Sequence, residues 1–104
     1  MIASVYAIFA DDAEARRIGR QMVEERLAAC VNIIGPCRSI YRWHGGIEET
    51  AEVAAIFKTT ADHARALIVR IAELHSYDVP AAVAWPVAEA PPAYAEWVQR
   101  ATSG

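Results

Sequence analysis

The chain has 104 residues, which is enough for one domain with a single hydrophobic core. Apolar residues make up 55% of it and charged residues 22%, a balance typical of folded domains that excludes intrinsic disorder. The formal net charge is −3, and the basic residues form no dense cluster. The charge pattern therefore argues against binding to nucleic acid or to an anionic membrane surface.

Two further features bear on location. No apolar run approaches the ~20 residues of a transmembrane helix, so no membrane insertion is expected. The first residues lack the basic-then-apolar pattern of a signal peptide, so a cytoplasmic location is expected.

Cys30 and Cys37 would lie roughly 23 Å apart in an extended chain, so a disulfide bond is not expected unless Gly35-Pro36 folds the chain back.

The chain opens with a strand and a helix. Residues 2–10 are almost wholly apolar, as in a strand buried on both faces. Asp11 and Glu14 have the spacing of a helix capping box. Apolar residues then recur at helical intervals, which predicts an amphipathic helix over residues 12–29.

A long hairpin comes next. Residues 30–43 are rich in strand-forming types, with a bend or bulge predicted at Gly35-Pro36. His44-Gly45-Gly46 predicts a tight turn into an alternating return strand over residues 47–57.

The second half predicts a helix over residues 61–75, an edge strand over residues 80–88 and a short helix after Pro91-Pro92. The order β-α-β-β-α-β with a C-terminal helix predicts an α+β ferredoxin-like sandwich, in which both main helices cover one face of an antiparallel sheet. No linker or repeat divides it, so residues 1–104 are expected to form a single domain.

The hairpin is longer than the globule that carries it. A chain of this size has a diameter of roughly 33 Å, whereas residues 30–43 stretch to about 46 Å as a strand. It should therefore project past its own helices and expose large apolar side chains, which is unfavourable on a free monomer. We expect four of them to pack against a neighbouring subunit: Ile40, Tyr41, Trp43 and Ile47.

His75 is the first candidate for chemistry. It ends the second predicted helix on its apolar side, and Tyr77 and Asp78 follow it. A neutral imidazole held by a neighbouring oxygen is a common metal ligand. A histidine that only caps the helix carbonyls fits the same spacing, so both interpretations stay open.

Cys30 stands where the first helix gives way to a strand. Its thiolate would suit Cu(I), and paired with His75 it would suit a thiol enzyme, although no oxyanion hole is evident. A buried packing residue is the simpler interpretation.

Charged residues elsewhere have both a functional and a simpler structural interpretation. The hairpin carboxylates Glu48, Glu49 and Glu52, together with the imidazole of His44, would bind a divalent cation weakly, but such acidic faces are more typical of a solvated strand. Lys58, the single lysine, either meets an anion near the second helix or is a surface charge at a strand end.

Four segments resemble the CutA divalent-cation tolerance proteins, in the same order and with matching gaps between about Ser4 and Val98: residues 24–32 (EERLAACVN), 39–45 (SIYRWHG), 58–59 (KT) and 73–80 (ELHSYDVP). The resemblance implies a compact homotrimer, related in shape to nitrogen-regulatory PII proteins. It also implies tolerance of copper and other divalent cations, weak binding of copper, and no catalytic activity.

The resemblance implies particular site residues as well. His75 would be the leading copper ligand and Cys30 a second one, while Phe9 stands where some members carry a first-strand cysteine proposed to bind copper. In a trimer, we expect five residues to converge with His75 in an inter-subunit cleft that takes a small molecule or metal: Tyr41, Trp43, Lys58, Tyr77 and Asp78.

Two alternative functions stay open. One is a PII-like regulatory module whose clefts bind a small anion or an unidentified regulatory partner protein. The other, less favoured, is a thiol enzyme that uses Cys30.

Overall fold

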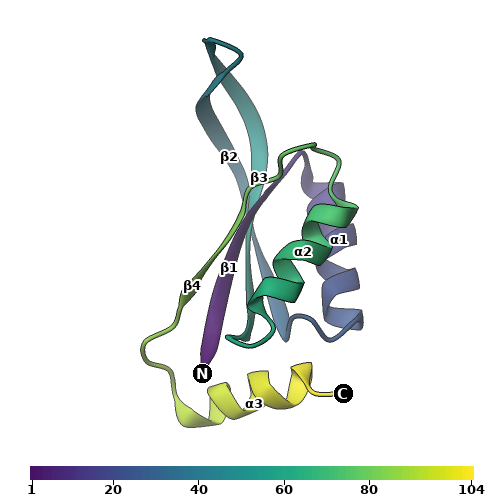
Figure 1. Ribbon diagram of the computed structural model, residues 1–104, viewed down its shortest axis with the longest axis vertical. Helices are drawn as coiled ribbons and strands as arrows, with labels where there is room; N and C mark the ends of the chain where they lie inside the picture. The colour runs from purple at the N-terminus through teal and green to yellow at the C-terminus, as the bar shows by residue number, and fades with distance from the viewer.

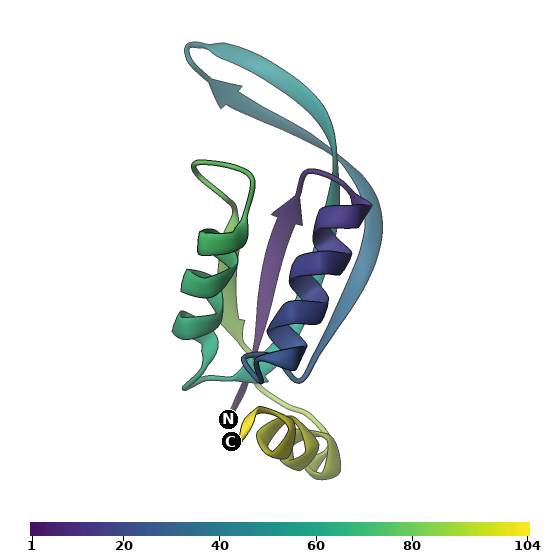
Figure 2. The same ribbon diagram turned by 90° about the vertical axis from the view of Figure 1, so that its right-hand side faces the viewer.

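A computed structural model describes residues 1–104. Its seven elements follow the predicted order (Figure 1): β1 (Ile2–Phe9), α1 (Asp12–Glu24), β2 (Cys30–Trp43), β3 (Gly46–Thr60), α2 (Ala64–Leu74), β4 (Ala82–Pro86) and α3 (Pro92–Thr102). The strands form one antiparallel sheet of order β2-β3-β1-β4. Figure 2 shows α1 and α2 side by side on one face of this sheet, which confirms the α+β ferredoxin-like prediction.

The core lies between the sheet and these two helices. Alternate residues of β1 point toward the helices because successive strand side chains face opposite ways. They meet the apolar stripes of α1 and α2 in one cluster whose largest members are fully buried: Val5, Phe9, Ile18, Met22, Phe57, Leu67 and Ile71. A smaller cluster around Ile2, Ala29 and Val98 fixes α3 across the opposite end of the sheet from the hairpin (Figure 1). None of the three helices has the length and apolar character needed to span a lipid bilayer.

The first helix ends earlier than predicted, at Glu24 rather than at residue 29. Arg26 adopts a left-handed conformation, with φ of 61°. The N–H of Leu27 then donates to the carbonyl oxygen of Met22 (3.0 Å) and the N–H of Arg26 to that of Val23 (3.1 Å). This pattern is a Schellman motif, which normally uses glycine at the left-handed position, so the sequence lacked the usual signal for the end of the helix.

Of the later elements, β3 is longer than predicted, since it continues to Thr60 rather than residue 57, whereas α2 and β4 are shorter. α2 begins at Ala64 rather than at residue 61, because residues 61–63 form a turn in which the His63 N–H donates to the Thr60 hydroxyl oxygen (3.2 Å). β4 covers five residues rather than residues 80–88. It is an edge strand that begins just after Pro80 and ends at Pro86. Proline has no N–H to donate to a sheet, which limits the length of the strand.

The hairpin of β2 and β3 projects from the domain, as predicted. β3 pairs with β1 only from Val53 to Thr60, so residues 46–52 pair with β2 alone. The molecule is therefore 45 Å long but only 25 and 21 Å across. In Figure 2 the tip of the hairpin curves back above the connection between α2 and β4.

The hairpin has its turn and its irregularity where they were predicted. His44 and Gly45 form a two-residue turn with φ values of 48° and 80°, the positive values that a type I′ turn requires. The pairing with β3 shifts between Ile33 and Gly35, which leaves Ile34 as the extra residue of a β-bulge. A bulge bends and twists a strand, which fits the curved course of the hairpin.

Candidate functional site

His75 lies at the end of α2 with no exposed side-chain surface. Its Nε2 lies 2.7 Å from the carbonyl oxygen of Ile8, and its Nδ1 accepts the backbone N–H of Tyr77 at 3.1 Å. A carbonyl can only accept and an N–H can only donate, so the ring is the neutral tautomer with its proton on Nε2. The ring also stacks on Phe9, with centroids 5.2 Å apart.

Both nitrogens of His75 are thus used within the chain. Copper at Nδ1 would have to displace the Tyr77 N–H, and copper at Nε2 would have to displace the Ile8 carbonyl. What the geometry supports directly is a connection from β1 to the loop after α2. The role of His75 as a copper ligand stays a prediction.

Glu14 adds a second connection at the same end of the domain. Its N–H donates to the Asp11 carboxylate (2.8 Å), as the predicted capping box requires. Its own carboxylate accepts the N–H groups of Ala10 (3.0 Å) and Ser76 (2.9 Å) instead of that of Asp11. Burial acts to raise the pKa of Glu14, but the hydrogen bonds from Ala10 and Ser76 outweigh it, so the pKa lies below its ordinary value.

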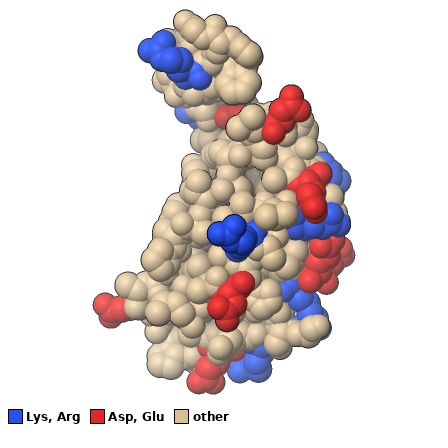
Figure 3. Space-filling view, viewed as in Figure 1, with Lys and Arg blue, Asp and Glu red and all other residues tan.

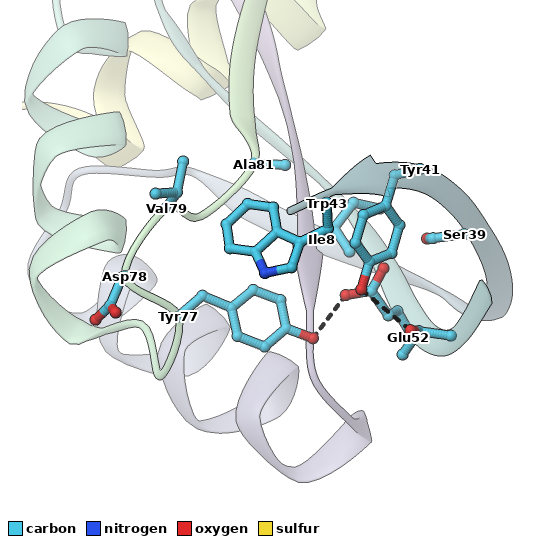
Figure 4. Close-up of a pocket in the computed structure, with 10 residues that line it drawn as sticks. Ile8, Ser39, Tyr41, Trp43, Glu52, Tyr77, Asp78, Val79 and Ala81 are labelled. Carbon is cyan, nitrogen blue, oxygen red and sulfur yellow. Dashed lines mark hydrogen bonds between the residues drawn. The ribbon is translucent and has the colours of Figure 1, made fainter. Parts of the chain in front are cut away.

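A cavity of about 580 Å³ lies between the hairpin and the loop that joins α2 to β4. Tyr41 and Trp43 enter it from β2, Glu52 from β3, and Tyr77 and Asp78 from the loop (Figure 4). Four of the five predicted cleft residues therefore lie around one cavity of a single chain.

Lys58 is the exception. It lies farther along β3, where it pairs with Ser4 of β1 and Cys30 of β2, and it does not line the cavity. The cavity consequently has carboxylates among its lining residues but no lysine or arginine.

Glu52 is the residue of this cavity whose burial the sequence did not indicate. It is only 8% exposed, and its Oε2 accepts a hydrogen bond from the Tyr77 hydroxyl at 2.6 Å. The interpretation of the hairpin carboxylates as a solvated face is therefore wrong for Glu52, because the loop after α2 covers it. Burial, and next the hydrogen bond to Glu52, raise the pKa of Tyr77 above its ordinary value.

Cys30 lies away from this cavity. Its Sγ is 3.6 Å from the Tyr94 hydroxyl of α3, and both cysteines are free thiols. Burial, and next the contact with Cys30, raise the pKa of Tyr94 to about 12. Cys30 pairs with Lys58, whereas His75 contacts Ile8 at the other end of β1, so one chain does not form the Cys30–His75 pair of a thiol enzyme.

The donors of one chain do not fit a closed copper centre. No three histidine, cysteine, aspartate or glutamate side chains lie close enough together to hold one ion. His75 and Cys30, the two predicted ligands, belong to different ends of the sheet. Any copper bound by a single chain would therefore have few protein donors.

Large apolar side chains remain exposed on the hairpin, as predicted. The exposed fractions are 66% for Ile40, 62% for Ile47, 49% for Trp43 and 39% for Tyr41. Val83 and Trp85 of β4 are also exposed. On the face seen in Figure 3, charged side chains gather over the helices, while the edge formed by β4 is mainly uncharged.

Residues 3–101 match the family model described as CutA1 divalent ion tolerance protein. The chain is 46% identical over 88 residues to the divalent-cation tolerance protein CutA of Thermus thermophilus, which covers 85% of each chain. It is 38% identical over 101 residues to Protein CutA of Mus musculus, covering 97% of this chain but 57% of the mouse protein.

Solved structures are similar over nearly the full length. CutA from Xylella fastidiosa superimposes with a TM-score of 0.95 at 37% identity, covering 98% of each chain. The structure described as the periplasmic divalent cation tolerance protein CutA from Archaeoglobus fulgidus has a TM-score of 0.96 at 31% identity, covering 99% of this chain and 100% of the other. The family model matches nearly the whole chain and the solved structures share its fold, so this chain belongs to the CutA1 divalent ion tolerance family.

Proposed function

We propose that the chain acts as a non-catalytic homotrimer in divalent-cation tolerance and that it binds copper weakly. The observation that carries the homotrimer is the hairpin, which projects from the domain with Ile40 and Ile47 more than half exposed. Exposed apolar surface of this kind is unfavourable in water, and a neighbouring copy would cover it.

The edge of the sheet supports the same assembly. β2 is an edge strand of 14 residues whose outer side pairs with no strand. Long unpaired edges attract other strands, and natural proteins cover them. In a closed trimer, each hairpin would extend or cover the sheet of the next copy, so that no copy keeps an open edge.

Weak copper binding follows from isolated donors. The half-buried thiol of Cys30 suits Cu(I), which prefers soft ligands, and the imidazole of His75 suits Cu(II). With few other donors close by, neither site would hold copper tightly.

Copper titration of the wild type and single variants tests this proposal. We expect Cys30→Ala to lower the affinity for Cu(I) and His75→Ala to lower that for Cu(II), each at least tenfold. Cys37→Ala and His44→Asn are the matched controls, because they remove the same ligand types from the hairpin. If Cys37→Ala and His44→Asn lower the copper affinities while Cys30→Ala and His75→Ala do not, copper binds adventitiously at the hairpin and the proposed sites are wrong.

A PII-like regulatory module is the second candidate function. The observation that favours it is the cavity of about 580 Å³, a size typical of small-molecule sites. Its lining of carboxylates without lysine or arginine does not suit the small anion expected from the sequence.

We also propose a cytoplasmic location, which two free cysteines support because reducing compartments preserve thiols. Fractionation of cells that express the full-length protein would test this, and recovery from the periplasm would contradict it.

A further inference from the structure

Glu52 is a buried carboxyl group that has no cationic partner within its own chain. One of its oxygens accepts the Tyr77 hydroxyl, and the carboxylate forms no ion pair with lysine, arginine or histidine. Burying a carboxylate without a cationic partner is costly, so proteins usually pair such groups. Glu52 is only 8% exposed and lacks such a partner, so a bound cation would stabilise its ionised form.

One oxygen of Glu52 has no partner within the chain. Oε1 makes no hydrogen bond, yet no fully enclosed side-chain polar atom of the protein lacks a partner. Oε1 is therefore not fully enclosed, and Glu52 lines the cavity. Asp78, the other lining carboxylate, points away from the aromatic rings in Figure 4. Glu52 is thus the negative charge on the inner wall.

Three aromatic rings complete that wall. Tyr41, Trp43 and Tyr77 line the same cavity as Glu52, and Figure 4 shows their rings next to it. The faces of such rings attract cations, tryptophan most strongly, with roughly 0.5–2 kcal/mol for each well-placed contact. A carboxylate beside aromatic rings suits an alkylated ammonium group.

A metal ion suits the same wall poorly. A divalent metal requires several oxygen, nitrogen or sulfur ligands, and no three ligand-type side chains gather here. The cavity of about 580 Å³ is also far larger than a metal site. An organic cation needs fewer polar contacts, because its alkyl groups pack against the rings.

We propose that this cavity binds a small organic ammonium ion, with its charge against Glu52 and its alkyl groups against Trp43 and Tyr41. The inference rests on the second candidate function, a small-ligand module, and it specifies a cation in place of the anion. All the residues that it uses belong to one chain.

Calorimetric titration of the full chain with tetramethylammonium, and with tert-butanol as an uncharged molecule of similar shape, tests the proposal. We expect tetramethylammonium to bind and tert-butanol to bind at least tenfold more weakly. Glu52→Gln should weaken tetramethylammonium binding at least tenfold, since it removes the charge and keeps the size. Glu48→Gln, an exposed position on the same hairpin that does not line the cavity, should change it less than twofold.

A second readout separates binding in the cavity from a change in folding. The methyl proton signals of tetramethylammonium should move upfield with wild-type protein, because aromatic rings shield nuclei above their faces. The binding result for Glu52→Gln is used only if this variant keeps the wild-type circular dichroism spectrum. If it does not fold, Trp43→Leu is the second variant, and it should reduce the upfield shift of the tetramethylammonium methyl signals.

Three outcomes would overturn the inference: no binding of tetramethylammonium, equal binding of tert-butanol, or equal affinity of the Glu52→Gln and wild-type proteins. A trimer that fails to bind would overturn this inference alone and leave the proposed assembly intact. A monomer that binds would leave the cavity site intact and contradict the proposed assembly.

Discussion

The carboxylate of Glu14 lies 3.9 Å from Nδ1 of His75, and both side chains are buried where α1 begins and α2 ends. Glu14 receives N–H groups from Ala10 and Ser76, and His75 donates to Ile8. The two residues together connect β1, α1 and the loop after α2. That loop carries Tyr77 into the cavity, so this connection positions one wall of the candidate site.

Replacing Glu14 should destabilise the fold. Glu14→Gln keeps the size of the side chain but presents an amide NH₂ where two backbone N–H groups need acceptors. Leaving one of those donors unsatisfied should lower the free energy of unfolding by about 2 kcal/mol. Urea denaturation at one protein concentration measures this. Glu24→Gln at the exposed end of α1 is the matched control, with an expected change within about 0.5 kcal/mol.

The contribution of Glu14 should depend on pH. Its pKa in the folded protein lies below the ordinary value of 4.5, so its ionised form stabilises the fold above that pH. This stability is lost as the pH falls through the lowered pKa of the folded state. The difference in unfolding free energy between wild type and Glu14→Gln should be full at pH 7 and should shrink below pH 4.5. If the difference in unfolding free energy between the two proteins stays constant down to pH 3, the ionised form of Glu14 does not stabilise the fold.

The end of α1 allows a paired test of backbone strain. Arg26 has a positive φ of 61°, which costs a non-glycine residue about 1 kcal/mol. Arg26→Gly and Arg26→Ala both remove the guanidinium, which lies 3.4 Å from the Ala101 carbonyl oxygen, but only glycine removes the strain. Thermal or urea unfolding should therefore find the glycine variant more stable than the alanine variant by about 1 kcal/mol. Equal stabilities would indicate that this conformation carries no strain.

The sequence predicted most of the fold because its signals are local. The turn at His44-Gly45, the bulge beside Gly35 and the cap at Asp11 each lie where the sequence placed them. The end of α1 was misplaced because Arg26 takes a conformation that normally needs glycine. Local patterns cannot report a left-handed residue that tertiary contacts hold in place.

The candidate site was predictable only in part. The resemblance indicated Tyr41, Trp43 and Tyr77, and they do gather around one cavity. Glu52 was missed because alternation along a strand specifies a face but not what covers it. The loop that buries it comes from a distant part of the chain, and no pattern around Glu52 reveals that contact.

Single substitutions should separate the assembly from the fold of one chain. Ile40→Glu places a charge on an exposed hairpin position that we expect a neighbouring copy to cover. It should shift the protein toward monomer in sedimentation experiments, with its circular dichroism spectrum unchanged. Val69→Glu is the matched control, because it makes the same change at an exposed site on α2. Loss of trimer in the control alone would place the contact on the helices instead.

The homotrimer is tested most directly by native mass spectrometry of the wild-type protein, purified without chelators. The projecting hairpin and the open edge of β2 predict one dominant species with three times the mass of a single chain at micromolar concentration. A spectrum of monomers alone would contradict the account, because Ile40 and Ile47, which do not line the cavity, would then lack the neighbour that their exposure requires.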